Sequence, residues 1–387
     1  MTPAEADAFA DRAAAYVHVP FCSAICPYCD FAVVSGRDDD IDHYMGAVVR
    51  EVRLSEPWRP LDAVYFGGGT PSHVPPASLG AVLSVLSEHH GLANDAELSL
   101  EANPEDFTAD GAAALRAEGF NRISFGAQSF DSSVLASLGR RHDPSDIASA
   151  VESARSGGFT NISIDLIYGT PGETNQSWRS TLERAIELGS DHISAYALTV
   201  ERGTTLGRAV SAGAAAPDPD LQVDRYELAD DVLSSAGFER YEVSNWARPG
   251  KECRYNLTVW AQGEYEAYGN GAHGFRRGRR FRNHRRLDAY LAAVETGTLP
   301  RAGTEEVAGW DAELDRVFVG LRRTVGVAHG PGTSGLLESD SGRQLLMAGV
   351  IVSNEARLGV RRPLLTDAVH RSVLSQTAPN VGGDDDA

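Results

Sequence analysis

The sequence predicts an α/β fold: a partial parallel barrel of six βα units, (β/α)6, followed by a small C-terminal winged-helix-like domain. Short runs of β-branched or aromatic residues recur, each followed by a Gly, Pro or Asn turn and then an Ala- and Leu-rich stretch. These runs begin roughly 25 to 50 residues apart, which is the spacing of βα units. One segment, residues 119–124, is echoed at 158–163 and at 189–194. The glycine that opens each copy is expected to end a helix just before the next parallel strand.

The six expected strands cover residues 15–19, 62–66, 97–101, 122–125, 161–167 and 192–198. Active sites of α/β barrels lie at the carboxyl ends of the strands, so functional groups are expected there. Further along, apolar residues with helical spacing predict a helix over 310–321, a second at 341–348 and a last one at 365–374. Two short strands, 350–352 and 358–360, would form a β wing between the last two helices.

These elements divide the chain into five parts. We expect an N-terminal tail (1–14), the barrel (15–240), a strand and hairpin extension with a basic strip (241–300), the C-terminal domain (301–376) and a disordered tail (377–387). Gly, Thr and Pro followed by acidic residues predict a linker at 297–306.

Composition excludes several classes of protein. The 387 residues carry a net charge of −19, which argues against a general binder of nucleic acid or of anionic membranes. The first 15 residues are neither a signal peptide nor a membrane helix, and no run of 18 apolar residues occurs. Four cysteines, three of them clustered, fit a reducing compartment. We therefore expect a cytoplasmic protein, with any membrane association peripheral and through a partner.

Three cysteines are spaced C-x3-C-x2-C at Cys22, Cys26 and Cys29, and the fourth, Cys253, lies far downstream. A 4Fe–4S cluster is usually held by four thiolates, so three would leave one iron with an open position. Phe31, two residues past the third cysteine, cannot be a ligand. The alternatives are three cysteines packed in a core, or a zinc site, although no second ligand pair lies near in sequence.

Polar groups follow successive strands at the expected functional edge. The second strand ends in a glycine run (67–69) whose bare N–H groups could bind a carboxylate, although an ordinary glycine-rich loop is an equal reading. Glu101, Gln128 and Asp165 lie at or near the ends of the next three strands. Singly, such groups are most often solvated or capping. Together they could bind a ribose, an amine and a sulfonium-bearing methionine.

These motifs, in this order, resemble a subgroup of the radical SAM superfamily. The subgroup contains oxygen-independent coproporphyrinogen III dehydrogenase and the heme chaperones of the HemW type. The likeness runs from Tyr16 to about Leu374 and rests on YVHVPFC, CxxxCxYCDF, YFGGGTPS, LEANPE, SFGAQSF, LGRRH, SIDLIYGTPGET, YEVSNWA and GNGAHG.

The resemblance implies roles for individual residues, and it assigns no catalytic residue. Cys22, Cys26 and Cys29 would ligate a 4Fe–4S cluster whose open iron is chelated by S-adenosylmethionine (SAM). Tyr16, Gly68 and Glu101 would contact SAM. Further residues would line the rest of the SAM region: Tyr28, Gly69, Thr70, Gln128, Arg140 and Asp165. Arg140 suits a carboxylate, which an arginine can bind in bidentate fashion.

Two departures favour the chaperone over the dehydrogenase. The dehydrogenase would have a fourth cysteine where this chain has Phe31, and a longer arm than the 15 residues that precede Tyr16. A chaperone would bind heme and hand it to an unidentified acceptor, such as a respiratory heme protein. The alternative is the dehydrogenase itself, which decarboxylates propionate side chains by means of a 5′-deoxyadenosyl radical.

The heme ligand is left open by the sequence. Residues 255–260 resemble a chaperone signature, H-N-x-x-Y-W, but Tyr255 stands in the histidine place. Tyr255, Cys253 and His273 are therefore candidate ligands, each of which could instead be an ordinary packed or surface side chain. The basic strip (276–286) is read first as a solvated hairpin. Its alternative role is to bind porphyrin propionates or an acidic partner, whereas nucleic-acid binding is disfavoured because no aromatic platform accompanies it.

Overall fold

The computed structural model describes residues 1–105, 107–376 and 378, and within them twelve strands form one sheet. The six predicted strands are confirmed as parallel neighbours in chain order. They are β1 (Ala13–Val19), β4 (Leu61–Gly68), β5 (Leu92–Ala102), β6 (Arg122–Gln128), β7 (Ile162–Tyr168) and β8 (His192–Ala197). Because they are parallel and consecutive, their carboxyl ends meet at one edge.

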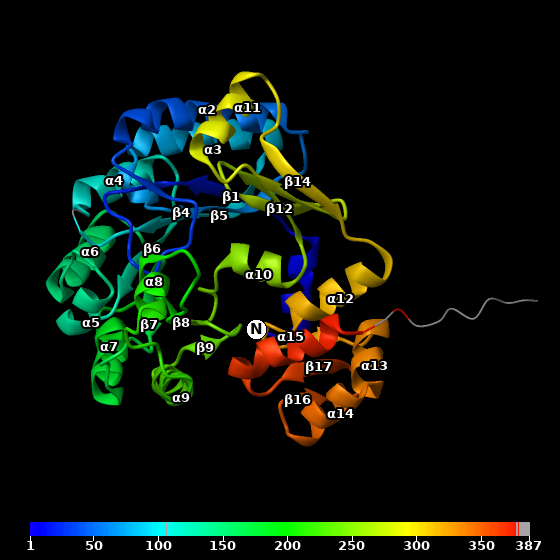
Figure 1. Ribbon diagram of the computed structural model, residues 1–387. Helices are drawn as coiled ribbons and strands as arrows, with labels where there is room; N and C mark the ends of the chain where they lie inside the picture. The colour runs from blue at the N-terminus through cyan, green and yellow to red at the C-terminus, as the bar shows by residue number, and fades with distance from the viewer. Residues whose placement is uncertain (106, 377, 379–387) are drawn as a thin grey trace, which may run out of the picture.

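Helices connect these strands and cover the outside of the curved sheet (Figure 1). They are α2 (Ile41–Leu54), α3 (Pro76–His90), α4 (Ala109–Ala117), α5 (Ser132–Ser137), α6 (Pro144–Ser156), α7 (Asn175–Glu187) and α9 (Pro219–Ser235). The short helix α8 (Thr205–Ser211) lies instead against the loop after β2 (Phe21–Cys22), where the Leu206 amide donates to the Pro27 carbonyl. The echoed glycines Gly119, Gly158 and Gly189 all have positive φ, which only glycine adopts readily, and each one ends a helix as predicted.

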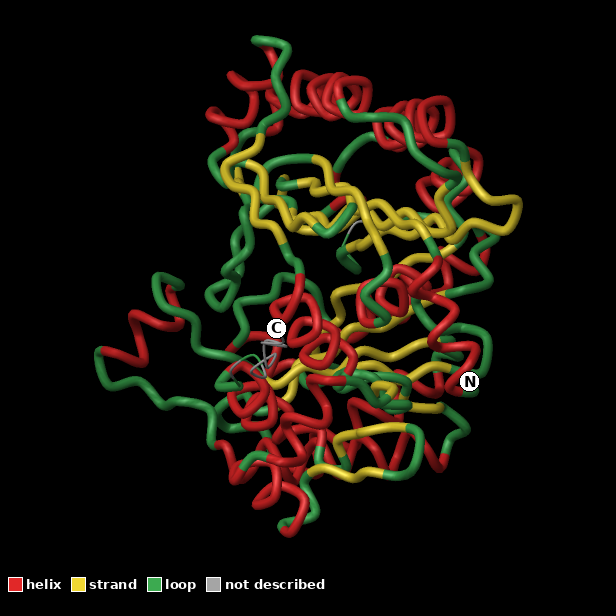
Figure 2. The backbone as a smooth tube through the Cα atoms, turned by 90° about the vertical axis from the view of Figure 1, so that its right-hand side faces the viewer, coloured by secondary structure: helices red, strands yellow, loops and turns green. Residues whose placement is uncertain are grey.

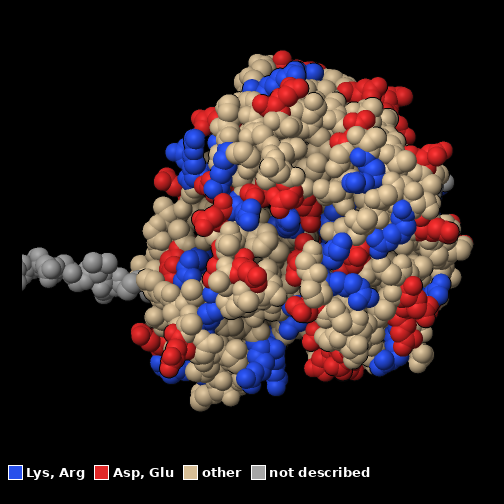
Figure 3. All heavy atoms as spheres, turned by 180° about the vertical axis from the view of Figure 1, so that it is seen from behind, with Lys and Arg blue, Asp and Glu red and all other residues tan. Residues whose placement is uncertain are grey.

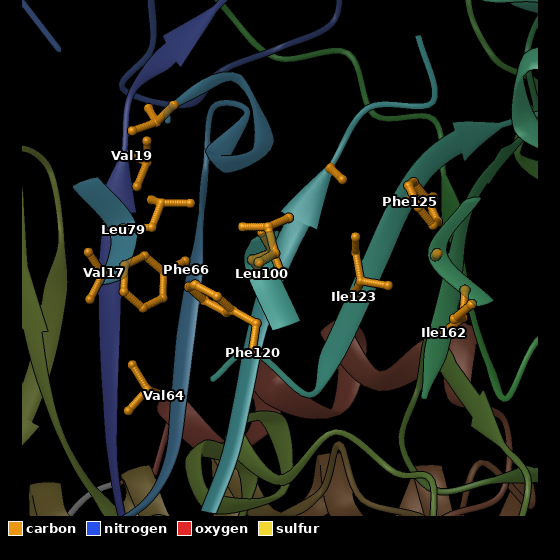
Figure 4. Close-up of a cluster of buried hydrophobic side chains, with 14 of the residues drawn as sticks. Val17, Val19, Val64, Phe66, Leu79, Leu100, Phe120, Ile123, Phe125 and Ile162 are labelled. Atoms are coloured by element: carbon orange, nitrogen blue, oxygen red, sulfur yellow. The ribbon is translucent and has the colours of Figure 1, made fainter. Parts of the chain in front are cut away.

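The main core fills the space between the sheet and these helices. Figure 4 shows Val17, Val64, Phe66, Leu100, Ile123 and Ile162, which come from successive strands, with Leu79 and Phe120 packed against them. All eight side chains are fully buried. Strands covered in this way read as β-branched and aromatic runs, which is why the sequence located them.

The extension completes both edges of the sheet. The strand β11 (Glu264–Tyr268) adds to β1 in parallel, followed by antiparallel β12 (His273–Arg276), β13 (Arg279–Asn283) and β14 (Arg301–Glu306). At the other edge lie β10 (Asn245–Ala247) and β9 (Glu239–Arg240). The prediction of a linker at 297–306 is wrong over its second half, because β14 pairs with β13. Figure 2 shows these strands in yellow with helices on either side.

Two helices belong to this extension. The helix α10 (Arg254–Trp260) contacts β1, β4 and β11 on the inner side of the sheet, and α11 (Leu287–Glu295) contacts α2 on the outer side. The basic strip forms the predicted hairpin, β12–β13, with a tight turn at Arg277 and Gly278, both at positive φ.

The C-terminal residues have a hydrophobic core of their own, built from Leu314, Val317, Ile351, Leu358 and Val369 among others. Its elements are α12 (Gly309–Gly320), β15 (Val327–Ala328), α13 (Pro331–Glu338), α14 (Asp340–Met347), β16 (Ile351–Ser353), β17 (Arg357–Val360) and α15 (Thr366–Leu374). The predicted wing strands pair, as β16 and β17. The helix α13 was not predicted, and the winged-helix-like assignment stays a prediction. The tail predicted at 377–387 lies outside the described residues, apart from Ala378.

The N-terminal residues are tied to the C-terminal domain and do not form a free tail. They fold as α1 (Pro3–Asp7) and a short 3-10 helix (Ala8–Asp11). Asp7 forms ion pairs with Arg323, at 3.0 Å, and with Arg357, at 2.6 Å. None of the helices in the described part of the chain is both long enough and apolar enough to cross a bilayer.

Candidate functional site

A cavity of about 490 Å³ opens at the carboxyl ends of the parallel strands. One wall is the loop that carries the three cysteines, and the other walls come from β4 to β8, the residues that follow these strands, and Cys253 and Asn256 at the start of α10. Of the predicted site residues, the cavity is lined by Cys22, Cys26, Cys29, Tyr28, Gly68, Gly69, Thr70, Glu101, Gln128, Arg140 and Asp165. The structure therefore brings together eleven of the twelve residues that the sequence singled out.

Tyr16 is the exception, because it is not among the residues that line this cavity. Its ring stacks on Tyr65, with 6.3 Å between ring centroids, and its hydroxyl lies 3.1 Å from Nδ1 of His18. Tyr65 lines the cavity and donates a hydrogen bond to Glu101. Contact of Tyr16 with SAM stays a prediction, and in the structure its ring packs on Tyr65.

The cysteine loop begins at Cys22, which ends β2 (Phe21–Cys22), and β2 pairs with β3 (Val34–Ser35). A turn joins Cys26 and Cys29, in which the Cys29 amide donates to the Cys26 carbonyl at 3.0 Å. The cysteines of this loop are free thiols. The Thr70 hydroxyl lies 3.6 Å from Cys22 Sγ, and Nη1 of Arg140 lies 3.4 Å from Cys26 Sγ.

This donor set fits a three-cysteine iron–sulfur cluster. Three free thiols line one cavity, and a guanidinium and a hydroxyl are placed to donate to two of the sulfurs. Within the described residues, no three His, Cys, Asp or Glu side chains converge to hold a single metal ion. Thiols that hold three corners of a cube need not converge on one point.

The amides of Gly68, Gly69 and Thr70 are already hydrogen-bonded within the chain, which favours the reading of an ordinary glycine-rich loop. The amide of Gly69 donates to Val19, that of Thr70 to Phe21, and that of Gly68 to Glu101. Glycine is needed here for close packing. A Cβ on Gly69 would lie 2.7 Å from the backbone of Pro20, and Gly68 has φ +112° with the ring of His18 against it.

Two carboxyl groups face the cavity from alternate strands. Glu101 accepts hydrogen bonds from the Tyr65 hydroxyl at 2.8 Å and the Gly68 amide at 3.0 Å. Burial, reinforced by Asp165, raises the pKa of Glu101 to about 7. Burial likewise raises the pKa of Asp165, which accepts from Ser124 at 2.8 Å. Burial and close spacing favour a ligand that supplies hydroxyl or ammonium donors to these groups.

Arg140 is held rigidly at the opposite wall. Its Nη2 donates to Asn103 Oδ1 at 2.7 Å and to the Gly126 carbonyl at 2.9 Å. Its Nε is buried without a partner among the described residues. Gln128 adopts φ +66°, an uncommon conformation for a residue other than glycine, where β6 ends beside the cavity.

Several lining residues were missed by the sequence reasoning. Tyr65, Arg122, Ser124, Asn103, His192, Ser194 and Tyr196 also line the cavity. Most lie within strands, where no motif marks them. Side chains on a strand point alternately to the two faces of the sheet. Once one residue of a strand is known to face the cavity, the residues two positions away can be expected to face it as well.

The three candidate heme ligands differ in accessibility. Cys253 is 1% exposed, and it lines the cavity. The Tyr255 ring packs against Tyr16, Tyr65 and Tyr265, with centroid separations of 5.3 to 6.0 Å. His273, at the start of β12, is exposed.

Comparisons with known proteins agree with this geometry. A family model described as the radical SAM superfamily matches residues 16–185. The heme chaperone HemW of Mycobacterium tuberculosis is 41% identical over 372 residues, which cover 93% of this chain and 94% of that protein. HemW of Bacillus subtilis is 33% identical over 81% of this chain and 84% of its own. The solved structure of coproporphyrinogen III oxidase (HemN) from Escherichia coli matches with a TM-score of 0.80 and 25% identity, covering 95% of this chain and 92% of that one.

Proposed function

This chain belongs to the radical SAM superfamily and, within it, to the heme chaperones of the HemW type, and on that basis we propose that it binds heme beside a SAM-chelated 4Fe–4S cluster and delivers the heme to an acceptor protein. The observation that carries the proposal is the single cavity that gathers three free thiols, two buried carboxyl groups and a guanidinium.

Cys22, Cys26 and Cys29 would hold the cluster. Phe31 carries no ligating atom, so one iron keeps a position for SAM. Arg140, next to Cys26, and Thr70, next to Cys22, would donate to ligand sulfurs and stabilise the negative charge of the cluster. When bound, the cluster and SAM supply the redox chemistry, while the protein supplies binding and orientation.

The remaining walls would bind SAM. Glu101 and Asp165 suit hydroxyl or ammonium donors, and the spare Nε–H of Arg140 suits a carboxylate. Gly68 and Gly69 would allow the end of β4 to pack closely against His18 and Pro20, where a larger residue would collide. This packing would position the Gly68 amide that binds Glu101. Tyr28 and Gln128 would close the sides, and Tyr16 would act through Tyr65.

The acceptor would be a heme protein, such as a respiratory one, and transfer would take place in the cytoplasm, with any contact with a membrane made through that partner. Nucleic acid is not a proposed ligand. Figure 3 shows Lys and Arg side chains interspersed with Asp and Glu on the face that it displays, and this mixture suits neither a phosphate backbone nor an anionic bilayer.

A second candidate function is coproporphyrinogen III dehydrogenase. The observation that favours it is the likeness to the solved E. coli oxidase over nearly the whole chain. Phe31 weighs against it, because the resemblance to the dehydrogenase calls for a cysteine at that place.

One anaerobic experiment separates the two functions. The reconstituted protein is given coproporphyrinogen III with SAM and a reductant, and the porphyrins are separated and quantified. The chaperone proposal predicts unchanged coproporphyrinogen. Repeated turnover to protoporphyrinogen would refute it and establish the dehydrogenase.

A further inference from the structure

His273 lies on the inner face of the sheet, on the side of the cavity. Tyr16 pairs with Ala267, and Tyr265 pairs with Phe275. Side chains two residues apart on a strand share a face, so His273 shares the face of Tyr265. The rings of Tyr16 and Tyr265 both contact Tyr255 from that face.

The turn that precedes His273 is fixed against the cysteine loop. The Asn270 side chain donates to the Ala32 carbonyl at 3.2 Å. Gly271, at φ +69°, lies so close to this loop that a Cβ there would be 2.8 Å from the Ala32 Cβ. Ala32 follows Phe31, whose side chain is 69% exposed and lines the cavity. The turn that leads into His273 therefore lies against the residue that follows Phe31.

Arginines surround the His273 imidazole. Arg282 faces it directly across the β12–β13 hairpin, and Arg285 binds Asp30 of the cysteine loop, with 3.3 Å to the carboxylate. Arg280 forms an ion pair with Asp315 at 2.6 Å, whereas Arg282 forms no ion pair within the described part of the chain.

The state of the imidazole suits iron ligation. Partial burial, together with these arginines, lowers the pKa of His273, and no hydrogen bond to a described residue contributes. The ring is therefore neutral at pH 7, with a nitrogen lone pair available.

We propose that His273 is an axial ligand of the bound heme, with the porphyrin beside Phe31 and a propionate on Arg282. We call these three residues the hairpin surface. A neutral imidazole binds heme iron, guanidinium groups bind carboxylates, and an exposed aromatic ring packs on a macrocycle. This inference rests on the proposed function and specifies where it takes place.

The placement also accounts for the two other candidates. Tyr255 would have to leave a cluster with three other tyrosine rings, and Cys253, which lines the cavity that SAM would fill, is only 1% exposed. A heme at the hairpin surface leaves the cavity to SAM, while the GNGAHG turn connects the heme ligand to the cysteine loop through Asn270.

The test is a titration of the full chain with ferric hemin, followed at the Soret band. We expect His273→Ala to weaken binding at least about tenfold and to shift the Soret maximum. Cluster absorbance and circular dichroism should be unchanged. His43→Ala, which removes an exposed histidine on α2, and Tyr255→Phe are the matched controls and should bind as the unsubstituted protein does.

A second variant tests the propionate contact. Arg282→Gln should weaken hemin binding about tenfold but leave the binding of hemin dimethyl ester unchanged, because the ester has no carboxylates. Unaltered affinity and Soret maximum in His273→Ala would overturn the assignment while the proposed function stands. Failure of the unsubstituted protein to bind hemin would overturn the proposed function and the assignment together.

Discussion

Asn270 offers the sharpest test of how the fold supports the site, because this one side chain joins the hairpin extension to the cysteine loop. It is 1% exposed. Its Oδ1 accepts from the Tyr44 hydroxyl at 2.9 Å, and its Nδ2 donates to the carbonyls of Ala32, at 3.2 Å, and Arg285, at 3.0 Å. We expect Asn270→Ala to destabilise the protein and to loosen the loop that carries the cysteines.

The magnitude follows from these three bonds. A buried hydrogen bond contributes about 1 kcal/mol net, so losing three lowers the free energy of unfolding by about 3 kcal/mol. The isosteric Asn270→Asp keeps the Tyr44 bond but sets a second acceptor against two carbonyl oxygens. Asn270→Asp should therefore lower the free energy of unfolding by at least as much as Asn270→Ala, although aspartate fills the same volume as asparagine.

The assay is urea unfolding of the apoprotein, followed by circular dichroism, with the rate of cluster loss after reconstitution as a second readout. Both variants should lose the cluster faster. Asn94→Ala, at an exposed asparagine, should stay within about 0.5 kcal/mol of the unsubstituted protein. If Asn270→Asp were as stable as the unsubstituted protein, the proposed donor role of Nδ2 would be refuted.

Three further predictions concern the cluster, a buried carboxyl group and the link between domains. Serine at any one of the three loop cysteines should abolish the cluster absorbance, whereas Cys253→Ser should retain it; a cluster that survives in a loop variant would refute the ligand assignment. Burial raises the pKa of Glu51 from 4.5 to about 7, so the folded state holds this proton more tightly than the unfolded state, and stability falls by up to about 3 kcal/mol as pH rises through that window. Glu51→Gln should reduce, but not remove, the dependence of the urea midpoint on pH between 5 and 7.5, because Glu101 titrates in the same range. An unaltered slope would contradict the role of Glu51. Asp7→Asn removes the partner of two arginines and should lower the free energy of unfolding by about 1 kcal/mol, with faster proteolysis near Arg323; protease resistance equal to that of the unsubstituted protein would show that the link does not hold the domains.

The fold was predictable where burial shapes the sequence. Most residues of β1 and β4 to β8 are buried, so these strands contain recognisable apolar runs. The strand β14 reads RAGTEE and is mostly exposed, so no hydrophobic pattern marks it. The helix α13 contains Gly332 and Gly335, which lower helix propensity, and it was missed for that reason.

The site was predictable where chemistry requires a fixed spacing. The three cysteines and the polar strand ends are visible in the sequence, and they lie together in the structure. The sequence left two readings of the glycine run open, because the bonds of the Gly68, Gly69 and Thr70 amides to Glu101, Val19 and Phe21 depend on how β4 lies against the cysteine loop. The pairing of His273 with Arg282 likewise depends on hairpin register, which a string of arginines does not reveal.

The central claim, that this radical SAM protein is a carrier of heme, is tested most directly by the stoichiometry of hemin binding to the cluster-loaded protein. We predict a saturable Soret change at one hemin per chain, with the porphyrin recovered chemically intact after incubation with SAM and reductant. Binding that never saturates, or conversion of the porphyrin in step with consumption of SAM, would contradict it.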